Sequence, residues 1–282
     1  MDPSILTSRR SPASATDNGS SARPRPLHDS DQPASNGAAA EGAHRNGRPA
    51  RLPAINGQIV DPAEITAEVE AMDAEDAIAW AIENFHPRLR FAVSFQKTSS
   101  VILDIAHRAE STARFFYLDT ELLFPETYAT RDALADRYGI EFERFAGISL
   151  TEQERLHGAN LWRRDPDACC GIRKVEAMRE ALESAECWVS GIRRADSESR
   201  AAAAKFGWDK RFGLWKLNPL ADWDDKRIWN HIKDHHVPYN PLHDQGYPSI
   251  GCIPCTSRPA EGEGSRAGRW AGTDRTECGL NG

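Results

Sequence analysis

The sequence lacks several features that would place it in other classes of protein. None of its apolar runs approaches the roughly 20 residues of a membrane-spanning helix, and its N-terminus lacks the apolar stretch of a secretory signal. It has no basic excess, since its formal net charge is -7, and phosphate neutralisation by a nucleic-acid-binding protein needs surplus cations. Repeats of solenoid length are also absent. These absences predict a cytoplasmic protein in a reducing compartment that binds neither membranes nor nucleic acid.

Residues 1–55 contain very few large apolar side chains. Ile5, Leu6 and Leu27 are the only larger aliphatic residues in the first 50 positions, and small or polar residues supply most of the rest. Such a segment cannot bury enough apolar area to offset its chain entropy, so we expect a disordered tail. An organelle transit peptide is the alternative, but acidic residues such as Asp29 count against it.

From residue 60 the pattern is that of a globular domain. Apolar residues recur at helical spacing over 63–85, and the segments that follow alternate between strand and helix patterns. This alternation predicts an α/β fold, an open and mostly parallel sheet with flanking helices. The expected strands are 89–95, 113–120, 140–146 and 187–194, and the expected later helices are 100–109, 125–139 and 224–236.

The chain after residue 256 changes in composition. Residues 257–282 are polar and rich in glycine, which is typical of a mobile segment. We therefore expect three parts: the tail 1–55, a globular domain 60–256 and a mobile C-terminal segment 257–282.

Polar loops follow three of the predicted strands. They read SFQKTSS (94–100), LDTELLFPETY (118–128) and SGIRRADSESR (190–200). The carboxyl ends of parallel strands meet at one edge of a sheet, where ligands collect. Serine and threonine in any single loop are most simply helix caps, but three converging loops favour an anion site, with a phosphate or sulfate at a helix N-terminus.

Four of the six cysteines form a pair of motifs, the adjacent Cys169 and Cys170 in CCGIRK and the C-x-x-C of Cys252 and Cys255. In a chain without a secretory signal, such a set indicates metal binding or redox chemistry rather than a disulfide framework. Cysteine thiolates bind both zinc and iron–sulfur clusters, so both are candidates, and the spacing alone favours zinc. Cys187 lies in an apolar strand and is most simply a small buried hydrophobe.

The ordered motifs resemble a known family. SFQKTSS, LDTELLFPETY, CCGIRK, GIRRADSESR, YNPLHDQGYPSIGCIPCT, GRW and the terminal ECGL are together similar to assimilatory adenylyl-sulfate reductase, the thioredoxin-dependent, iron–sulfur branch of the phosphoadenylyl-sulfate reductase family. The similarity spans roughly residues 60–282. It implies an adenine-nucleotide alpha-hydrolase-like fold and a [4Fe-4S] cluster in place of zinc. The implied cluster ligands are Cys169, Cys170, Cys252 and Cys255.

The resemblance also implies a reaction. Cys278 would attack the sulfur of adenosine 5'-phosphosulfate, release AMP and form an S-sulfocysteine, which thioredoxin as a separate partner would resolve to sulfite in cysteine biosynthesis. The sister branch, which reduces the 3'-phosphorylated substrate, typically lacks the four cysteines, and is the alternative. The residues expected to bind substrate are Ser94, Phe95, Leu118, Thr120, Lys174, Arg193, Arg266 and Arg269.

Three positions depart from the family pattern. Lys97 is unexpected within its loop, Asp196 stands where glutamine is common, and Asn281 replaces the histidine that usually follows ECGL. Asn281 keeps hydrogen bonding but loses a charge that would assist substrate binding or the thiolate, so weaker turnover is expected.

Two other classes compete with this interpretation. An ATP-dependent adenylating enzyme of the same fold should carry an SGGxDS loop, which the sequence lacks. A non-catalytic iron–sulfur sensor would explain four cysteines but not Cys278. The sequence leaves a homo-oligomer open.

Overall fold

The computed structural model describes residues 51–271, 275 and 277–280. Most of the predicted tail, residues 1–50, and also Asn281 lie outside the described residues. At the start of the described chain, β1 (Ala54–Ile55) pairs antiparallel with β2 (Gln58–Ile59). No helix in the described part of the chain is both long enough and apolar enough to cross a membrane.

The central element is a six-stranded sheet with the order β5-β4-β3-β6-β8-β7. Neighbouring strands run parallel except for β7 and β8, which pair antiparallel at one edge. The prediction of an open, mostly parallel sheet is therefore confirmed. The strands are β3 (Leu89–Ala92), β4 (Arg114–Leu118), β5 (Glu143–Phe145), β6 (Cys187–Val189), β7 (Phe206–Asp209) and β8 (Leu214–Leu217).

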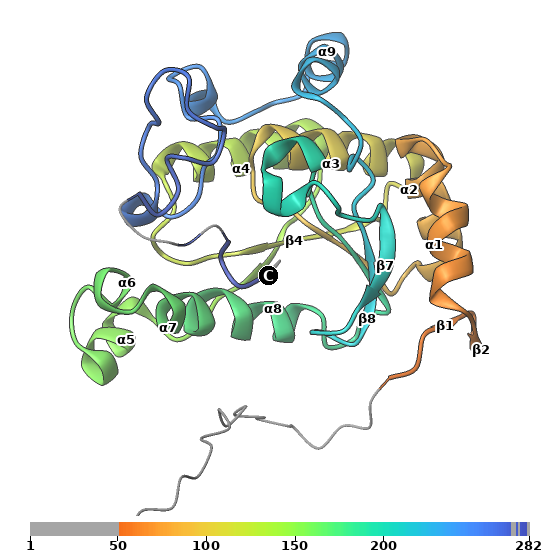
Figure 1. Ribbon diagram of the computed structural model, residues 1–282, viewed down its shortest axis with the longest axis horizontal. Coiled ribbons are helices and arrows are strands. Elements are labelled where there is room, and N and C mark those ends of the chain that lie inside the picture. Colours follow the sequence, from red (N-terminus) through yellow and green to blue (C-terminus); the bar gives the residue numbers. More distant parts are fainter. Residues whose placement is uncertain (1–50, 272–274, 276, 281–282) are drawn as a thin grey trace, which may run out of the picture. The chain divides into compact units, whose positions relative to one another are not determined.

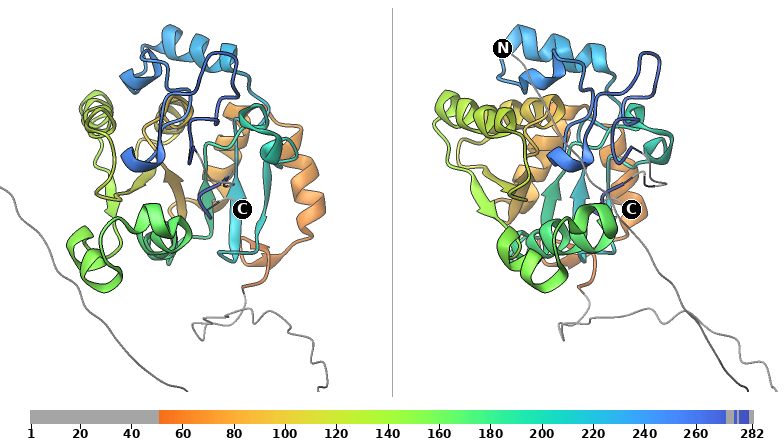
Figure 2. Two further views of the ribbon diagram at one scale, coloured as in Figure 1. Left: turned by 60° about the vertical axis from the view of Figure 1, so that its left-hand side comes forward. Right: turned by 90° about the vertical axis from the view of Figure 1, so that its left-hand side faces the viewer.

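Helices cover both faces of this sheet (Figure 1). The helices α3 and α4 lie on one side and α7 and α8 on the other, and the two views of Figure 2 show the same layers. The helices are α1 (Pro62–Glu70), α2 (Ala74–Phe85), α3 (Lys97–Ala109), α4 (Pro125–Tyr138), α5 (Leu150–His157), α6 (Leu161–Arg164), α7 (Pro166–Cys170), α8 (Glu176–Ala181) and α9 (Asp225–His235).

The alternation of side chains along β4 explains the two layers of core. Phe115 and Tyr117 pack into the larger apolar cluster, while Phe116 and Leu118 belong to the smaller cluster on the opposite face. Leu280, near the end of the chain, also packs against the smaller cluster. Leu280 thus lies against the side of the sheet that α8 covers.

The CCGIRK motif lies on an unusually wound stretch of helix. Between α7 and α8 the chain forms one π-helical turn, η1 (Gly171–Val175), so the three elements follow one another without a break. Such turns are rare and frequently occur at functional sites. This turn carries Arg173 and Lys174 directly after the cysteine pair.

Candidate active site

One cavity of about 240 Å³ lies at the carboxyl ends of the parallel strands. It is lined by Cys278 and by every residue that the sequence analysis nominated for substrate binding, and no nominated residue lies elsewhere. These are Ser94, Phe95, Leu118, Thr120, Lys174, Arg193, Arg266 and Arg269.

The register of three strands brings the loops together. Phe91 in β3 lies opposite Phe115 in β4 and Val189 in β6, and all three strands run in the same direction. Their following loops therefore leave the sheet at one edge, as the parallel arrangement requires. Ser94, Thr120 and Ser190 reach the cavity from these loops.

Phe95 adopts a backbone conformation that is uncommon for a residue with a side chain. Its φ is 57°, in the left-handed region, and its ring is buried between Tyr117 and Phe142 at centroid distances of 5.4 and 5.1 Å. Such a conformation costs free energy and persists where the surroundings fix it. The aromatic contacts hold the chain in a sharp turn between β3 and α3.

The structure explains the unexpected Lys97. Its side chain is buried, and Nζ lies 2.8 Å from Asp225 at the start of α9. Its backbone N–H donates to Nε2 of His243 at 3.1 Å, so the first N–H of α3 already has a protein partner. Lys97 therefore joins the first loop to α9, and its charge is shared with a carboxylate.

Arg193 occupies the centre of the third loop with only 4% of its side chain exposed. Its Nη2 lies 2.7 Å from Asp196 and 2.6 Å from Asp225, so one guanidinium joins two carboxylates. Among the described residues, its buried Nε has no hydrogen-bond partner. Because buried polar atoms are nearly always paired, this N–H is a candidate donor to a ligand in the cavity.

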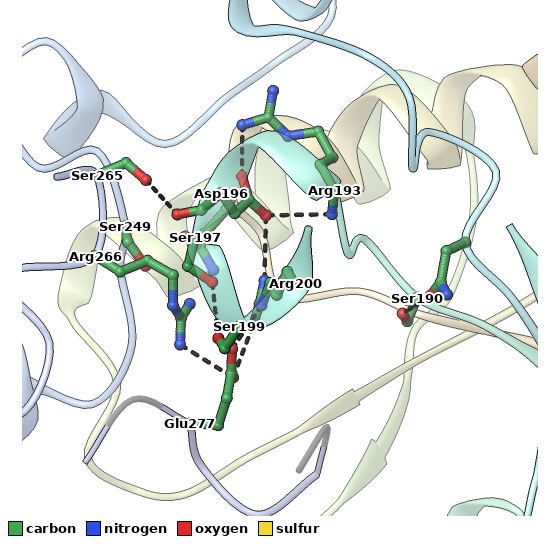
Figure 3. A network of polar contacts seen from close by, with 12 residues as sticks. Ser190, Arg193, Asp196, Ser197, Ser199, Arg200, Ser249, Ser265, Arg266 and Glu277 are labelled. Carbon is green, nitrogen blue, oxygen red and sulfur yellow. Dashed lines mark hydrogen bonds and ion pairs between the residues drawn. The ribbon is translucent and has the colours of Figure 1, made fainter. Parts of the chain in front are cut away.

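Asp196, one of the departures from the family pattern, is likewise fully engaged. Its carboxylate accepts from Arg193 and, at 3.1 Å, from Nη1 of Arg200 (Figure 3). An uncharged glutamine could not form these two ion pairs. The aspartate therefore fits the arginines of its own loop.

The Cys278 thiol lies among positive charges. Burial and the neighbouring carboxylate of Glu277 oppose its ionisation, but Lys174, the backbone N–H of Leu280 and Arg269 outweigh them and lower the pKa of Cys278 below that of an ordinary cysteine. A lowered pKa raises the fraction of thiolate, which is the nucleophilic form. The thiol also lines the cavity, so it meets both requirements of a nucleophile.

Lys174 lies where two cavities meet. It lines the strand-end cavity and also a second, smaller one that all four cysteines of the CC and C-x-x-C motifs line. Burial favours its neutral form, yet the sulfurs of Cys252, Cys278 and Cys170 raise the pKa of this lysine above its ordinary value. Lys174 therefore carries its charge between the two cavities.

The four cysteines that line the smaller cavity come from two distant segments. Burial and the neighbouring thiols of Cys170, Cys252 and Cys255 raise the pKa of Cys169 to about 11. The four sulfurs are thus close enough for their charges to interact. Within the described residues, no group of three or more His, Cys, Asp or Glu side chains is arranged to hold a metal ion.

Several polar side chains approach the sulfurs of this cysteine set. Thr120 Oγ1 lies 3.2 Å from Cys252 Sγ, and Arg275 Nη1 donates to Cys170 Sγ at 3.6 Å. A longer contact of 4.0 Å joins Gln153 Nε2 to Cys169 Sγ. Hydrogen bonds from an outer layer of residues are typical around metal-binding thiolates.

Sequence reasoning missed several polar residues of the site. Arg200 and Glu277 bind each other, and Arg173 donates to the backbone oxygen of Thr120 at 2.6 Å and so supports the second loop. The three arginines of the loop 190–200 were a signal for Arg200. Its pairing with Glu277 could not be predicted because the two residues are 77 positions apart.

Comparison with known proteins identifies relatives over most of the chain. Residues 88–258 match the phosphoadenosine phosphosulfate reductase domain. The chain is 41% identical over 221 residues to adenosine 5'-phosphosulfate reductase of Salinibacter ruber, covering 78% of this chain and 88% of the relative. It is 42% identical over 215 residues to the protein of the same name from Oceanobacillus iheyensis, covering 75% of this chain and 89% of that protein.

A solved structure supports the fold. Phosphoadenylyl-sulfate (PAPS) reductase from Candida auris, crystallised as a phosphate complex, superposes with a TM-score of 0.63 at 27% identity, covering 71% of this chain and all of that one (100%). The expected adenine-nucleotide alpha-hydrolase-like fold is therefore confirmed.

Proposed function

The chain belongs to the phosphoadenosine phosphosulfate reductase family, and we propose that it reduces adenosine 5'-phosphosulfate to sulfite and AMP in sulfate assimilation. In this proposal residues 60–256 form the nucleotide-binding reductase domain and 257–282 carry the catalytic cysteine. The observation that carries it is the position of Cys278, a thiol of lowered pKa, in one cavity with Lys174 and the strand-end loops.

The cavity supports binding of an adenine nucleotide with its phosphosulfate. Ser94, Phe95, Leu118 and Thr120 line it from the ends of β3 and β4, and the unpartnered Nε of Arg193 offers a buried donor. Lys174, Arg266 and Arg269 line the same cavity as Cys278 and supply it with positive charge. These three cations would meet the phosphosulfate, the part of the substrate with the most negative charge.

The first chemical step follows from this arrangement. The Cys278 thiolate attacks sulfur, a bond forms between the two sulfur atoms, and the S–O bond to AMP breaks with its electron pair leaving on the phosphate. Lys174 and Arg269 stabilise both the thiolate and the negative charge that develops on the departing phosphate. No ATP is consumed.

The second step needs an external dithiol. A thioredoxin thiolate attacks Sγ of the S-sulfocysteine, sulfite leaves with the electron pair of the S–S bond, and the second thioredoxin thiol resolves the mixed disulfide. Thioredoxin is thereby oxidised as the substrate sulfur is reduced. We place this reaction in the cytoplasm, where thiols are kept reduced.

The cysteine set that lines the smaller cavity is suited to a [4Fe-4S] cluster. Four thiols converge there from two segments, which matches the Cys₄ ligand set of such clusters, and polar side chains approach three of the sulfurs. Cys169, Cys170, Cys252 and Cys255 would hold it. When bound, the cluster would supply charge and redox-active iron next to Lys174.

The proposal is tested by incubating the purified protein with adenosine 5'-phosphosulfate and reduced thioredoxin in the absence of ATP. AMP and sulfite should appear in equal amounts, and Cys278→Ser should form neither. A parallel incubation contains ATP in place of the phosphosulfate. Release of pyrophosphate there, with no AMP formed in the first incubation, would instead indicate an adenylating enzyme of the same fold.

A further inference from the structure

Arg200 and Glu277 form a two-point ion pair between the third loop and the C-terminal segment. Nε of Arg200 donates to Oε1 at 2.6 Å and Nη2 donates to Oε2 at 2.8 Å (Figure 3). The two side chains are only 12% and 11% exposed. A buried pair with this paired geometry is among the stronger side-chain contacts and fixes orientation as well as distance.

Further contacts surround this ion pair, one within the C-terminal segment and one between that segment and the third loop. Arg266 Nη2 donates to Oε2 of Glu277 at 3.1 Å, and Ser265 Oγ donates to the backbone oxygen of Asp196 at 2.8 Å. Asp196 in turn accepts from Arg200. Figure 3 shows that Arg200 and Arg266 approach Glu277 from different parts of the chain.

Cys278 follows Glu277 directly and is held from both sides. Glu277 is fixed by Arg200, and Leu280 packs against the smaller apolar cluster beside α8. Gly279 between them has φ 69°, a left-handed conformation that glycine adopts without strain and that turns the chain. Since consecutive Cα atoms are about 3.8 Å apart, anchoring the preceding residue and the residue two positions later confines the thiol to the cavity wall.

We propose that Glu277 is a positioning residue that, through Arg200, holds Cys278 in place for attack on the substrate. The inference rests on the proposed role of Cys278 as the nucleophile. It adds that Glu277 and the substrate compete for Arg266, because this guanidinium both binds the carboxylate and lines the cavity.

Glu277→Gln should therefore slow the formation of the S-sulfocysteine without weakening substrate binding. A misplaced nucleophile loses about 10- to 100-fold in the rate constant of S-sulfocysteine formation, because small displacements of reacting groups are costly. The dissociation constant for adenosine 5'-phosphosulfate should stay the same or fall, because Arg266 no longer binds the Glu277 carboxylate. A residue that merely supported the fold would weaken both.

Further variants distinguish an effect on the position of Cys278 from an effect of the charge of Glu277. Arg200→Met should slow the same step, and the double variant should be no slower than the slower single variant, since each single variant already lacks the Arg200–Glu277 pair. Glu277→Asp keeps the charge but is one carbon shorter, so it should resemble Glu277→Gln if position is decisive. Glu152→Gln is the matched control, because it removes an exposed Arg155–Glu152 pair with the same two-point geometry at 2.7 and 2.6 Å.

The experiment measures three quantities on the full chain as purified: substrate affinity, the single-turnover rate of sulfur-label transfer to Cys278, and amide hydrogen exchange of the peptide that contains 277–280. Slower labelling, unweakened affinity and faster exchange in Glu277→Gln support the inference. A labelling rate equal to that of the wild type, a parallel loss of affinity, or unchanged exchange would overturn this inference and leave the proposed function standing. Failure of the wild-type protein to label Cys278 would overturn the proposed function and this inference together.

Discussion

Thr120 Oγ1 lies 3.2 Å from Sγ of Cys252. Thr120 belongs to the loop after β4 and lines the strand-end cavity, whereas Cys252 lines the smaller cavity with the other three cysteines. The backbone joins these two segments as well, since Ile253 N donates to the oxygen of Leu122 at 2.7 Å. Replacing one of these cysteines should therefore also alter nucleotide binding in the strand-end cavity.

Replacement of Cys252 tests the cluster and this connection. The purified protein should be brown and contain iron and acid-labile sulfide in near equal amounts, and Cys252→Ser should lose both. We also expect weaker AMP binding in this variant, because the contact with Thr120 changes. Metal and sulfide analysis and an AMP titration measure the two effects.

Cys187→Ala is the matched control for this substitution. Cys187 is fully buried in β6, away from both cavities, so its replacement should leave iron and sulfide unchanged at a small cost in stability. Zinc without labile sulfide after anaerobic purification would contradict the cluster assignment.

The reactivity of Cys278 should depend on pH in a defined direction. Its pKa is lowered in the folded protein, so the rate of its alkylation should reach half of its maximum at a lower pH than in urea-unfolded protein. Lys174→Met removes the largest favourable charge and should move that midpoint upward. Peptide mass spectrometry after iodoacetamide treatment measures the site and rate.

The exposed Lys210 provides the control, since Lys210→Met should not move the midpoint. Iron content is measured in each variant so that a lost cluster is not mistaken for a lost charge. An unchanged midpoint in Lys174→Met at full iron content would show that Lys174 does not act on the thiol.

The buried carboxylate of Asp104 lies outside the candidate active site and should contribute to the stability of the fold. Burial disfavours its charged form, but contacts with His231, Tyr138 and Arg108 lower the pKa of Asp104 overall. Its contribution is therefore present above the unfolded pKa of about 3.9 and is lost as the pH falls through the lower folded value. Asp104→Asn should reduce the free energy of unfolding at pH 7 by about 3 kcal/mol.

Urea unfolding measured between pH 7 and pH 3 checks this prediction. Asp132→Asn, which removes an exposed pair with Arg131, should cost less than about 1 kcal/mol. Equal effects of the two substitutions would mean that the buried carboxylate contributes no more than a surface pair.

Sequence patterns predicted the fold best where local signals were strong. Helix α4 begins at Pro125, as expected, and ends before Gly139, whose φ of 64° is typical of a helix cap. Helix α3 starts at Lys97 instead of the expected residue 100, because Gln96 and Ser99 form a capping box inside the polar loop. The hairpin of β7 and β8 was not predicted.

Sequence patterns predicted the loops of the site but not the contacts between residues that are distant in the sequence. Strand-end loops in a parallel sheet must converge, so a site formed by the loops 94–100, 118–128 and 190–200 could be predicted from order alone. The individual residues Ser94, Thr120 and Arg193 were nominated from the family resemblance. Partners such as Arg200 and Glu277 are 77 residues apart, and no periodicity joins them. The same holds for Lys97 and Asp225, which meet only through the packing of α3 against α9.

Substrate preference should follow from how the cations of the cavity are paired. Lys97 and Arg193 both bind Asp225, so they are poorly placed to bind a second phosphate. We expect kcat/KM for adenosine 5'-phosphosulfate to exceed that for its 3'-phosphorylated analogue by more than about tenfold. Asp225→Asn should narrow this ratio, because it removes the carboxylate partner of Lys97 and one of the two carboxylate partners of Arg193.

Asp222→Asn is the control, since Asp222 pairs with Lys205 outside the cavity and should leave the ratio unchanged. Comparable kcat/KM values for the two nucleotides in the wild-type protein would refute the preference and favour the alternative, a reductase of the 3'-phosphorylated substrate.

The most direct test of the account is to find the sulfur atom during turnover. The protein is incubated with sulfur-labelled adenosine 5'-phosphosulfate in the absence of thioredoxin, digested and analysed by mass spectrometry. We predict one label per chain on Cys278, released as sulfite by a dithiol, and no label in Cys278→Ser although its cluster and much of its nucleotide affinity remain. Label that survives this substitution, or that appears on Cys187, would contradict the assignment of Cys278 as the nucleophile.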